Sequence, residues 1–441
     1  MNSASPSPAA AFIEAIETRR ATVGVVGLGY VGIPLSRSLA QAGFRVTGFD
    51  ILSERIAQFE RNESPIGHIS DDDIKAMRAA GFSATTDFAH AAACDAVIIC
   101  VPTPLDAHRT PDLGFVENTM ASLAPHLRAG QLLSLESTTW PGTTQEVLAP
   151  VIKAAGLTIG EDFFLVYSPE RENPGDKKFE TVTIPKIVGG QTAACLAAGS
   201  ALYGAVIDRI VPVSSTKTAE MVKLVENIHR SVNIGLVNEL KIACDGMGLD
   251  IFEIIEAAAT KPFGFTPYYP GPGVGGHCIP VDPFYLTWKA REYGIDTRFV
   301  TLAGDVNAAM PDFVTDKVVR ALNERDIAMQ GARILALGIA YKPDVEDARE
   351  SPSIEVIKRL LAWNAKVDYS DPHVPVFPKM RKYSYDLSSI ELTPATLASY
   401  DAVIMLTAHS VFDTDMIASS ARLIIDTRGL WRQDQPNVVR A

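Results

Sequence analysis

The sequence predicts an α/β protein with an N-terminal doubly wound parallel sheet, a central helical domain with a long linking helix, and a C-terminal α/β domain. Three observations predict this fold. Residues 21–50 follow the order strand, glycine turn, amphipathic helix, strand and acid, and residues 332–372 repeat that order. Between them, residues 214–248 keep a helical pattern for longer than the average helix of a soluble protein.

The first repeat carries the spacing G-x-G-x-x-G at Gly27, Gly29 and Gly32, between the strand and the helix. Gly27 allows the tight turn, Gly29 lets a pyrophosphate approach the start of the helix, and Gly32 lets the helix lie close to the strand. Asp50 ends the second strand, where it would accept hydrogen bonds from the adenosine ribose and repel the 2′-phosphate of NADP. The pattern predicts a Rossmann-like domain that binds NAD.

Three further strands are expected in this half, at residues 95–104, 131–139 and 163–170. Parallel sheets of this kind bind ligands at the carboxyl ends of their strands. The polar residues Thr103, Thr138 and Glu170 fall at those ends. They are candidate site residues, although helix capping and turn formation also explain them.

The long central helix carries Lys223 and Asn227, which are four residues apart and therefore share one face. Such a pair usually lies on a solvated surface. Here its neighbours include Met221, Leu224 and Ile228. We therefore expect both polar groups to be buried, on a helix that links two domains or forms a subunit interface.

The second repeat has no G-x-G-x-x-G, because Gly338 is followed by an isoleucine and an alanine. It should bind something other than a dinucleotide. Lys342, Arg349 and Arg428 place cations near its expected strand ends. Such groups suit a phosphorylated or carboxylated ligand.

The five cysteines are widely spaced and include no C-x-x-C pair, which argues for a reducing compartment and against disulfides and a metal site. Cys278 alone lies in a Pro- and Gly-rich loop, "GGHCIPVDPF". A thiolate there could attack an aldehyde, and the thioester formed after hydride loss could be hydrolysed to an acid. Lys223 could stabilise the thiolate or an oxyanion. Asp282 could act as a base or cap the next helix.

The net charge of −12 and the pI of about 5.2 argue against nucleic acid and anionic membranes as partners. The first 20 residues predict a disordered or helical extension without the pattern of a signal peptide. No apolar run reaches the roughly 18 residues of a membrane span. We expect a cytoplasmic protein.

Eight motifs occur in one order along the chain: "GLGYVGIPL", "VPTPLD", "ESTTWPGTT", "SPERENPG", "KLVENIHRSVNIGLVNEL", "GVGGHCIPVDPFYL", "GIAYKPDVEDARESPS" and "DTRG". Together they resemble the UDP-glucose/GDP-mannose (nucleotide-sugar) dehydrogenase family. The resemblance runs from about residue 21 to the C-terminus. It implies a four-electron oxidation of the sugar C6 alcohol to a carboxylate, with two NAD reduced per sugar.

The resemblance also implies roles for individual residues. Cys278 matches the nucleophile, Lys223 and Asp282 match its lysine and aspartate, and Asn227 matches the asparagine that holds the oxyanion. Thr138 and Glu170 match the residues that organise water and proton transfer. The implied cofactor contacts are Gly27, Gly29, Tyr30, Val31, Gly32, Asp50, Arg55, Thr103, Thr138 and Arg349. The implied substrate contacts are Glu170, Arg171, Lys223, Asn227, Gly275, Tyr341, Lys342 and Arg428.

The implied domains are an extension (1–20), an NAD-binding domain (21–213), a central helical dimerisation domain carrying the cysteine loop (214–328) and a UDP-sugar-binding domain (329–441). A homodimer or dimer of dimers follows from the central helices of relatives. Within the family the chain looks most like the branch that oxidises UDP-N-acetylglucosamine for bacterial surface polysaccharides such as O-antigen and capsule. His277 and Pro174 depart from the glucose-specific pattern.

Alternatives remain at this point. UDP-N-acetylmannosamine, UDP-N-acetylgalactosamine and UDP-glucose differ from the expected sugar only at C2 or C4. A two-electron dehydrogenase would use Lys223 and Asn227 without the thiol. A non-catalytic sensor would bind a nucleotide sugar without turnover.

Overall fold

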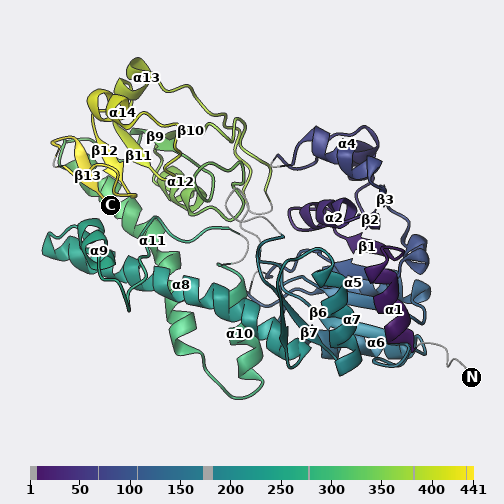
Figure 1. Cartoon of the computed structure of the whole chain (residues 1–441). Coiled ribbons are helices and arrows are strands. Elements are labelled where there is room, and N and C mark those ends of the chain that lie inside the picture. The colour runs from purple at the N-terminus through teal and green to yellow at the C-terminus, as the bar shows by residue number, and fades with distance from the viewer. Residues whose placement is uncertain are drawn as a thin grey trace, which may run out of the picture. The chain divides into compact units, whose positions relative to one another are not determined.

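The computed structural model describes residues 7–67, 69–106, 108–171, 182–276, 279–380, 383–433 and 435–441. The chain divides into two compact units, Met1–Glu226 with Phe284–Ile295, and Asn227–Pro283 with Asp296–Ala441. Each unit is built on one sheet (Figure 1). The predicted α/β fold, with a sheet in each terminal half, is confirmed.

The first unit holds an eight-stranded sheet in the order β3-β2-β1-β4-β5-β6-β7-β8. Its strands are β1 (Thr22–Val26), β2 (Arg45–Phe49), β3 (Phe82–Thr85), β4 (Ala96–Ile99), β5 (Gln131–Leu135), β6 (Phe163–Tyr167), β7 (Lys186–Gly190) and β8 (Ile210–Val213). All neighbours are parallel except β6 and β7, which are antiparallel. The strand order reverses between β1 and β4, so their carboxyl ends form the switch point at which such sheets bind ligands.

The strands β4, β5 and β6 are buried along their whole length. Their nearly continuous apolar sequences suit a parallel sheet covered on both faces. The α-helices of this unit are α1 (Pro8–Glu17), α2 (Gly32–Gln41), α3 (Ser53–Glu60), α4 (Asp71–Ala79), α5 (Gly114–Leu123), α6 (Ala149–Ala154) and α7 (Ala193–Gly204). Shorter helical turns are η1 (Phe88–Ala93), η2 (Ala124–His126) and η3 (Thr144–Leu148). Phe12 and Ile16 of α1 pack into the same core as α2 and α7.

The long helix predicted at residues 214–248 is α8 (Thr216–Met247), which has 32 residues. The other helices of the central region are α9 (Ile251–Ala259), α10 (Asp282–Arg291) and α11 (Arg298–Asn323). Asp250 caps α9 by accepting a hydrogen bond from the backbone of Phe252 at 2.9 Å. Of the described helices, none combines the length and apolarity needed to cross a membrane.

The second unit holds a five-stranded parallel sheet in the order β10-β9-β11-β12-β13. Its strands are β9 (Arg333–Leu337), β10 (Lys366–Ser370), β11 (Ala402–Met405), β12 (Ile424–Asp426) and β13 (Val438–Arg440). Its helices are α12 (Pro352–Ala362), α13 (Pro394–Ala398) and α14 (Thr414–Ser420). The strand order reverses between β9 and β11, which places a second switch point at their carboxyl ends.

The two sheets share a hydrogen bond to an aspartate that explains why residues 95–101 and 401–407 have similar sequences. Asp95 precedes β4 and accepts a hydrogen bond from the N–H of Thr22 at 2.9 Å. Asp401 precedes β11 and accepts one from the N–H of Arg333 at 2.8 Å. In each sheet an aspartate therefore satisfies the first N–H of the neighbouring strand, which otherwise lies at the end of the ladder.

Candidate active site

The glycine turn after β1 divides its three glycines into two kinds. Gly27 has φ +94°, and a Cβ on it would lie 2.7 Å from the carbonyl oxygen of Cys100. A Cβ on Gly32 would lie 1.9 Å from the carbonyl oxygen of Gly27. A Cβ on Gly29 would have no atom within 4 Å. Gly27 and Gly32 are thus required by the fold itself, whereas the space at Gly29 is open for a pyrophosphate.

Asp50 lies directly after β2 and is buried. Its Oδ2 accepts hydrogen bonds from the N–H of Leu28 at 3.1 Å and from Nη1 of Arg55 at 2.8 Å. Its Oδ1 accepts one from the N–H of Leu52 at 3.0 Å. A carboxylate offers about four acceptor positions, so one position is left for a ribose hydroxyl. The structure brings together two of the expected cofactor residues, Asp50 and Arg55.

Thr103, Thr138 and Glu170 follow β4, β5 and β6, three adjacent strands of one sheet. The hydroxyl of Ser137 donates to the carbonyl oxygen of Val101 at 2.7 Å, which ties the β4 and β5 ends together. The sequence prediction that these polar residues lie at one edge of the sheet is therefore supported by the strand order. Thr138 is half-buried.

Lys223 of α8 is buried, and its Nζ donates to the carbonyl oxygen of Glu170 at 2.6 Å. It also forms an ion pair with Oε2 of Glu170 at 3.3 Å. The solvated alternative for Lys223 is therefore wrong. The pairing places a buried ammonium group at the end of β6, among the strand ends where a ligand binds.

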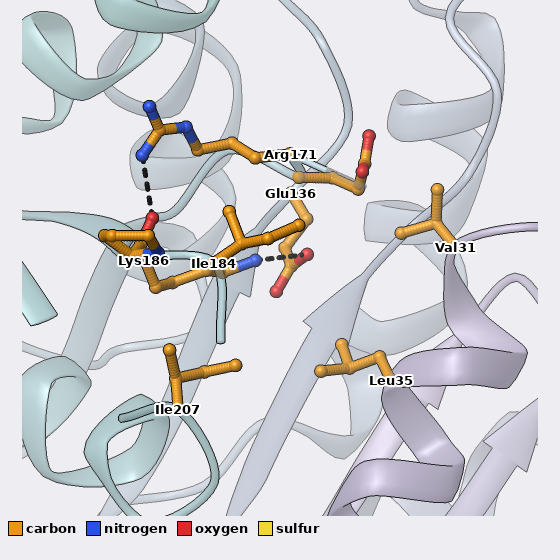
Figure 2. A pocket seen from close by; sticks show the side chains of 9 residues that line it. Val31, Leu35, Glu136, Arg171, Ile184, Lys186 and Ile207 are labelled. Carbon is orange, nitrogen blue, oxygen red and sulfur yellow. Dashed lines mark hydrogen bonds and ion pairs between the residues drawn. The ribbon is translucent and has the colours of Figure 1, made fainter. Parts of the chain in front are cut away.

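Arg171, the residue after Glu170, is held from two sides. Its Nη2 pairs with Oε1 of Glu226 at 2.5 Å, and its Nη1 donates to the carbonyl oxygen of Pro185 at 2.7 Å. Both bonds hold the guanidinium against residues of the first unit. Arg171 also lines the pocket shown in Figure 2.

The pocket lies between Val31 and Leu35 on one side and Lys186 and Ile207 on the other, with Glu136 between them (Figure 2). Lys186 pairs with Oε2 of Glu136 at 2.8 Å. Oε1 of Glu136 is buried and has no hydrogen-bond partner among the described residues. This pair was not predicted from the sequence, although a charged residue directly after the apolar strand β5 is a usable signal.

In the second unit, Asn227 of α8 and Asp282 of α10 form a buried pair. Nδ2 of Asn227 donates to Oδ2 of Asp282 at 2.5 Å. Asp282 is the first residue of α10, so it stands at the helix start while it also holds the amide of Asn227. The structure therefore brings these two expected site residues together. The second N–H of the amide is a donor that could serve an oxyanion.

The glycine-rich loop before Cys278 packs against the C-terminal sheet domain. A Cβ on Gly275 would lie 2.7 Å from Cδ of Pro352 and 3.0 Å from Cβ of Tyr341. Nζ of Lys342 lies 5.8 Å from the centre of the Tyr341 ring. Three of the expected substrate residues, Gly275, Tyr341 and Lys342, are therefore grouped in this unit.

Arg428 lies in the same region. Its Nε donates to the carbonyl oxygen of Leu406 at 2.6 Å, and a Cβ on Gly271 would lie 2.6 Å from its Nη1. Burial lowers the pKa of Arg428 to about 10, and the charge of Asp426 acts in the opposite direction. The guanidinium is still charged at neutral pH, as a phosphate ligand requires.

Arg349, an expected cofactor residue, forms a two-pronged pair with the carboxylate of Asp347. The two distances are 2.9 Å from Nε and 2.7 Å from Nη2. Its side chain is exposed. The other nine expected cofactor residues belong to the first unit, whereas Arg349 belongs to the second.

Cys278, the expected nucleophile, and His277 lie outside the described residues. The loop that leads to them is anchored by the side-chain amides of Asn238 and Asn307, which were not predicted as site residues. Oδ1 of Asn238 accepts the N–H of Gly271 at 3.1 Å, and its Nδ2 donates to Oδ1 of Asn307 at 2.9 Å. Nδ2 of Asn307 donates to the carbonyl oxygen of Ser231 at 3.1 Å.

The other four thiols do not fit a nucleophile. Cys94, Cys195 and Cys244 are buried and Cys100 is half-buried. Burial raises the pKa of the Cys94 thiol to about 11. A thiol that stays protonated at neutral pH is a poor nucleophile.

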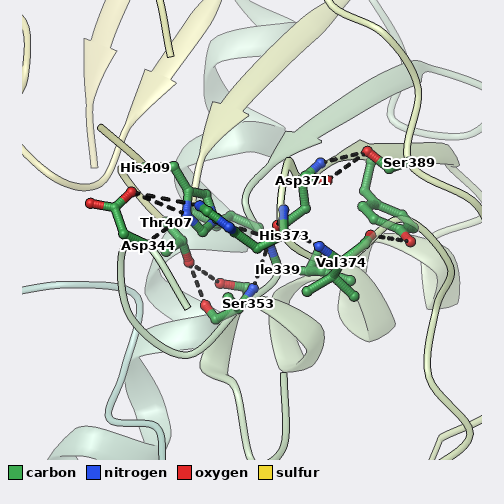
Figure 3. Close-up of polar contacts among 12 residues, drawn as sticks. Ile339, Asp344, Ser353, Asp371, His373, Val374, Ser389, Thr407 and His409 are labelled. Carbon is green, nitrogen blue, oxygen red and sulfur yellow. Dashed lines mark hydrogen bonds and ion pairs between the residues drawn. The ribbon is translucent and has the colours of Figure 1, made fainter. Parts of the chain in front are cut away.

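Figure 3 shows a second polar cluster, in the C-terminal sheet domain. Side-chain atoms of Asp344, His373 and His409 that could bind a metal lie within 4.8 Å of one another. Nδ1 of His409 accepts the N–H of Asp344 at 3.0 Å, and its Nε2 lies 3.1 Å from Oδ2 of Asp371. Both ring nitrogens are therefore engaged, and His409 can ligate a metal only by breaking one of these bonds. The cluster is a hydrogen-bonded clamp.

Comparison with known proteins agrees with this arrangement. Three models of the UDP-glucose/GDP-mannose dehydrogenase family match the chain: the NAD binding domain over residues 21–207, the central domain over 217–309 and the UDP binding domain over 335–433. The chain is 37% identical to a UDP-N-acetyl-D-glucosamine 6-dehydrogenase of Pseudomonas aeruginosa, over 88% of this chain and 91% of that one. It is 35% identical to an NDP-N-acetyl-D-galactosaminuronic acid dehydrogenase of Ralstonia solanacearum, over 95% and 98%.

A solved structure of a UDP-D-ManNAc dehydrogenase from Pyrococcus horikoshii matches with a TM-score of 0.85 and 31% identity, over 95% of this chain and 98% of that one. The glycine turn, the acid after β2 and the open space at Gly29 fit NAD on their own geometry. The chain belongs to the UDP-glucose/GDP-mannose dehydrogenase family and is an NAD-dependent UDP-sugar dehydrogenase.

Proposed function

We propose that the chain oxidises the C6 hydroxyl of UDP-N-acetylglucosamine to a carboxylate, for the synthesis of a bacterial surface polysaccharide such as an O-antigen or a capsule. The observation that carries the proposal is the buried contact of Lys223 with Glu170 at the end of β6. It places a cation among the ligand-binding strand ends, where an oxyanion would form. The sugar is chosen from the 37% identity to the Pseudomonas aeruginosa enzyme.

The proposed chemistry divides among a few groups. NAD, when bound, supplies the hydride acceptor for each of the two oxidations. The Cys278 thiolate adds to the aldehyde, and water later cleaves the thioester to release the acid and restore the thiol. Lys223 and the amide of Asn227 stabilise the oxyanion. Asp282 holds that amide in place through their bond of 2.5 Å.

Thr138 and Glu170 order the water and move its proton. Glu170 meets the ammonium of Lys223 and lies beside the pocket of Figure 2. The proposed NAD contacts of the first unit are Gly27, Gly29, Tyr30, Val31, Gly32, Asp50, Arg55, Thr103 and Thr138. Arg349 of the second unit is proposed as a further contact. The geometry of Asp50 favours NAD over NADP, because its free acceptor position would face the phosphate of NADP.

The UDP moiety is assigned to residues 329–441. Lys342 and Arg428 would pair with the diphosphate, and Tyr341 lies beside Lys342 on the loop after β9. Arginine and lysine are the usual protein partners of phosphate oxygens. The remaining proposed domains are residues 1–20, 21–213 and 214–328.

A homodimer formed through the central helices is part of the proposal. Large apolar side chains are exposed on and beside α8 and α9, at Leu236, Leu240, Met247, Leu249 and Ile254. A helical surface of this kind usually marks a protein interface. We assign it to a second copy of the chain.

The experiment that tests the function is a count of NADH formed per sugar at completion. The wild type and Cys278→Ser are compared with limiting UDP-N-acetylglucosamine and excess NAD, and Cys244→Ala serves as the control because Cys244 is buried away from the expected chemistry. We expect two NADH per sugar for the wild type and the control, and no completed four-electron turnover for Cys278→Ser.

The other outcomes separate the alternatives. One NADH per sugar, with an unaffected Cys278→Ser, would mean a two-electron dehydrogenase. Turnover only with UDP-N-acetylmannosamine, UDP-N-acetylgalactosamine or UDP-glucose would replace the sugar and keep the chemistry. Binding of nucleotide sugars without any NADH would mean a sensor, a role that the comparisons do not support.

A further inference from the structure

Glu220 of α8 is a buried carboxylate that no expected function includes. Its side chain is 0% exposed. Its Oε2 accepts the N–H of Gly142 at 2.5 Å, and its Oε1 accepts the N–H and the hydroxyl of Thr144 at 2.8 and 2.7 Å. All three donors belong to Gly142 and Thr144, at the start of the helical segment formed by η3 and α6. Burial of a carboxylate is costly, so these bonds at the helix start are what allow Glu220 to be ionised there.

The loop that Glu220 holds begins at the end of β5 and carries Thr138. In the same loop the Trp140 ring packs against the Trp288 ring, with 4.7 Å between the ring centres. It also stacks on Tyr285 at 6.2 Å, and the hydroxyl of Tyr285 donates to the carbonyl oxygen of Thr103 at 3.1 Å. The position of this loop therefore determines where Thr138 lies relative to the end of β4.

Lys223 follows Glu220 by three residues on the same helix, so the two side chains lie on one face. Lys223 holds the backbone of Glu170 at the end of β6. Two charged residues one turn apart on α8 thus hold the segments that follow two neighbouring strands, β5 and β6. A shift of the helix against either segment would change the distance between Lys223 and Thr138.

Besides Lys223 on α8, the charged groups near the residues that Glu220 binds are Glu146, Lys217 and Lys289. A Cβ on Gly142 would lie 2.6 Å from Oε1 of Glu146 and 3.2 Å from Cε of Lys217. Lys289 pairs with Glu146 at 2.8 Å. Burial raises the pKa of Glu220 to about 7, the three hydrogen bonds act against this rise, and the charge of Glu146 adds to it.

We propose that Glu220 is a positioning residue for the oxidation, whose ionised form fixes the loop carrying Thr138 against the helix carrying Lys223. The inference rests on the proposed roles of those two residues. A protonated carboxyl has lost its charge, and it accepts hydrogen bonds from the backbone N–H groups of Gly142 and Thr144 more weakly than a carboxylate does. The loop is then released on one side, and the site loses its geometry.

The sign of the pH dependence follows. Glu220 is ionised above its pKa of about 7 and becomes protonated as the pH falls through that value. We therefore expect kcat to fall on the acid side of neutrality in the wild type. The KM for the nucleotide sugar should change little, because Glu220 touches only the loop.

The test is the pH profile of kcat at saturating NAD for the wild type and Glu220→Gln. Glutamine keeps the shape but turns one acceptor into a donor that faces N–H groups. We expect kcat at pH 8 to fall by about tenfold to a hundredfold, the cost of displacing a site by about 1 Å. The acid limb, which is the fall of kcat as the pH drops through about 7, should be absent in Glu220→Gln. Full activity, or an unchanged limb, would overturn the proposal.

Two further variants keep the proposal falsifiable if Glu220→Gln folds poorly. Thr144→Val removes one donor, so the limb should move to higher pH. Glu146→Gln removes the neighbouring negative charge, so the limb should move to lower pH with little change of kcat at pH 8. A limb that stays in place in both variants belongs to another group and rules out Glu220.

Hydrogen exchange separates this inference from the proposed function. Protection of the backbone amides of Gly142 and Thr144 is compared between the wild type and Glu220→Gln at one pH. Unchanged protection overturns the positioning role, whatever the enzyme oxidises. Lost protection supports the positioning role of Glu220. If the wild type then oxidises no nucleotide sugar, the proposed function fails.

Discussion

The N-terminal and C-terminal sheets place an aspartate at the same point and use it differently. Asp50 follows β2 and Asp371 follows β10, each on the strand beside the first strand of its unit. Each binds the backbone of the glycine turn, at the N–H of Leu28 (3.1 Å) and of Ile339 (2.7 Å). The local frame is therefore the same in the two halves.

The difference lies in what else binds each acid. Asp50 has two more partners and keeps an acceptor position for a ligand. Asp371 has four more, the N–H groups of Ala340, His373 and Val374 and the ring of His409. Its side chain is 0% exposed. Figure 3 shows Asp371 among these partners. The acid after β2 therefore keeps an acceptor position for a ligand, whereas the acid after β10 is held by five internal hydrogen bonds.

The largest expected effect is on the clamp. Asp371→Asn turns one oxygen into a donor that faces buried N–H groups, and it should lower the free energy of unfolding by about 3 kcal/mol. Urea denaturation followed by circular dichroism would measure the loss. Asp368→Asn is the control, because Asp368 lies on the same strand and accepts only the hydroxyl of Tyr400. A loss below about 1 kcal/mol for Asp371→Asn would show that the five bonds are not a clamp.

A smaller effect is expected at Asp50, and it should appear in cofactor binding rather than in the free energy of unfolding. Asp50→Asn should weaken the binding of NAD by about tenfold, or 1.4 kcal/mol, and reduce the ratio of the affinity for NAD to that for NADP. The unfolding free energy should fall by less than in Asp371→Asn. Titration of NADH fluorescence gives the dissociation constant, and Glu54→Gln on the neighbouring helix is the matched control. Equal binding of NADH by Asp50→Asn and the wild type would show that Asp50 does not bind the cofactor.

The smallest effect is confined to acid. Burial by itself raises the pKa of Asp371, but the hydrogen bond from His409 and those from the N–H groups of Ile339 and His373 outweigh it, so the pKa is lowered. A lowered pKa gives stability that is complete above the unfolded value of about 3.9 and is lost as the pH falls through the folded pKa. The difference in unfolding free energy between wild type and Asp371→Asn should therefore be constant from pH 8 to pH 5 and narrow below pH 4. A difference that stays constant down to pH 3 would contradict the lowered pKa.

Features that are local in sequence were predicted well. Both sheets, the helix α8 and the acids after β2 and β10 follow from strand, turn and helix patterns within a few tens of residues. Asn227 and Asp282 were both predicted as site residues, but the hydrogen bond between them was not predicted. The antiparallel pairing of β7 with β6 was not foreseen, since the short sequence of β7 carries no signal for the direction of its neighbour.

Features that depend on distant partners were missed. Glu220 binds a loop 76 residues away, and His409 reaches Asp371 across 38 residues. In the sequence Glu220 is one acid on a helix with many polar residues, and His409 is a single histidine. No periodic pattern marks a residue whose partner is a backbone N–H elsewhere in the chain. Cys278 lies outside the described residues, so its expected role stays a prediction.

The open space at Gly29 has a consequence for genetic variation. Any missense change at Gly27 or Gly32 forces a Cβ into a carbonyl oxygen, so it should reduce both the abundance of the folded protein and its activity. At Gly29 a methyl group meets nothing, so an alanine variant should accumulate normally and fail only where the cofactor is needed. One motif therefore holds two classes of allele, which a screen for abundance and a screen for growth would divide differently.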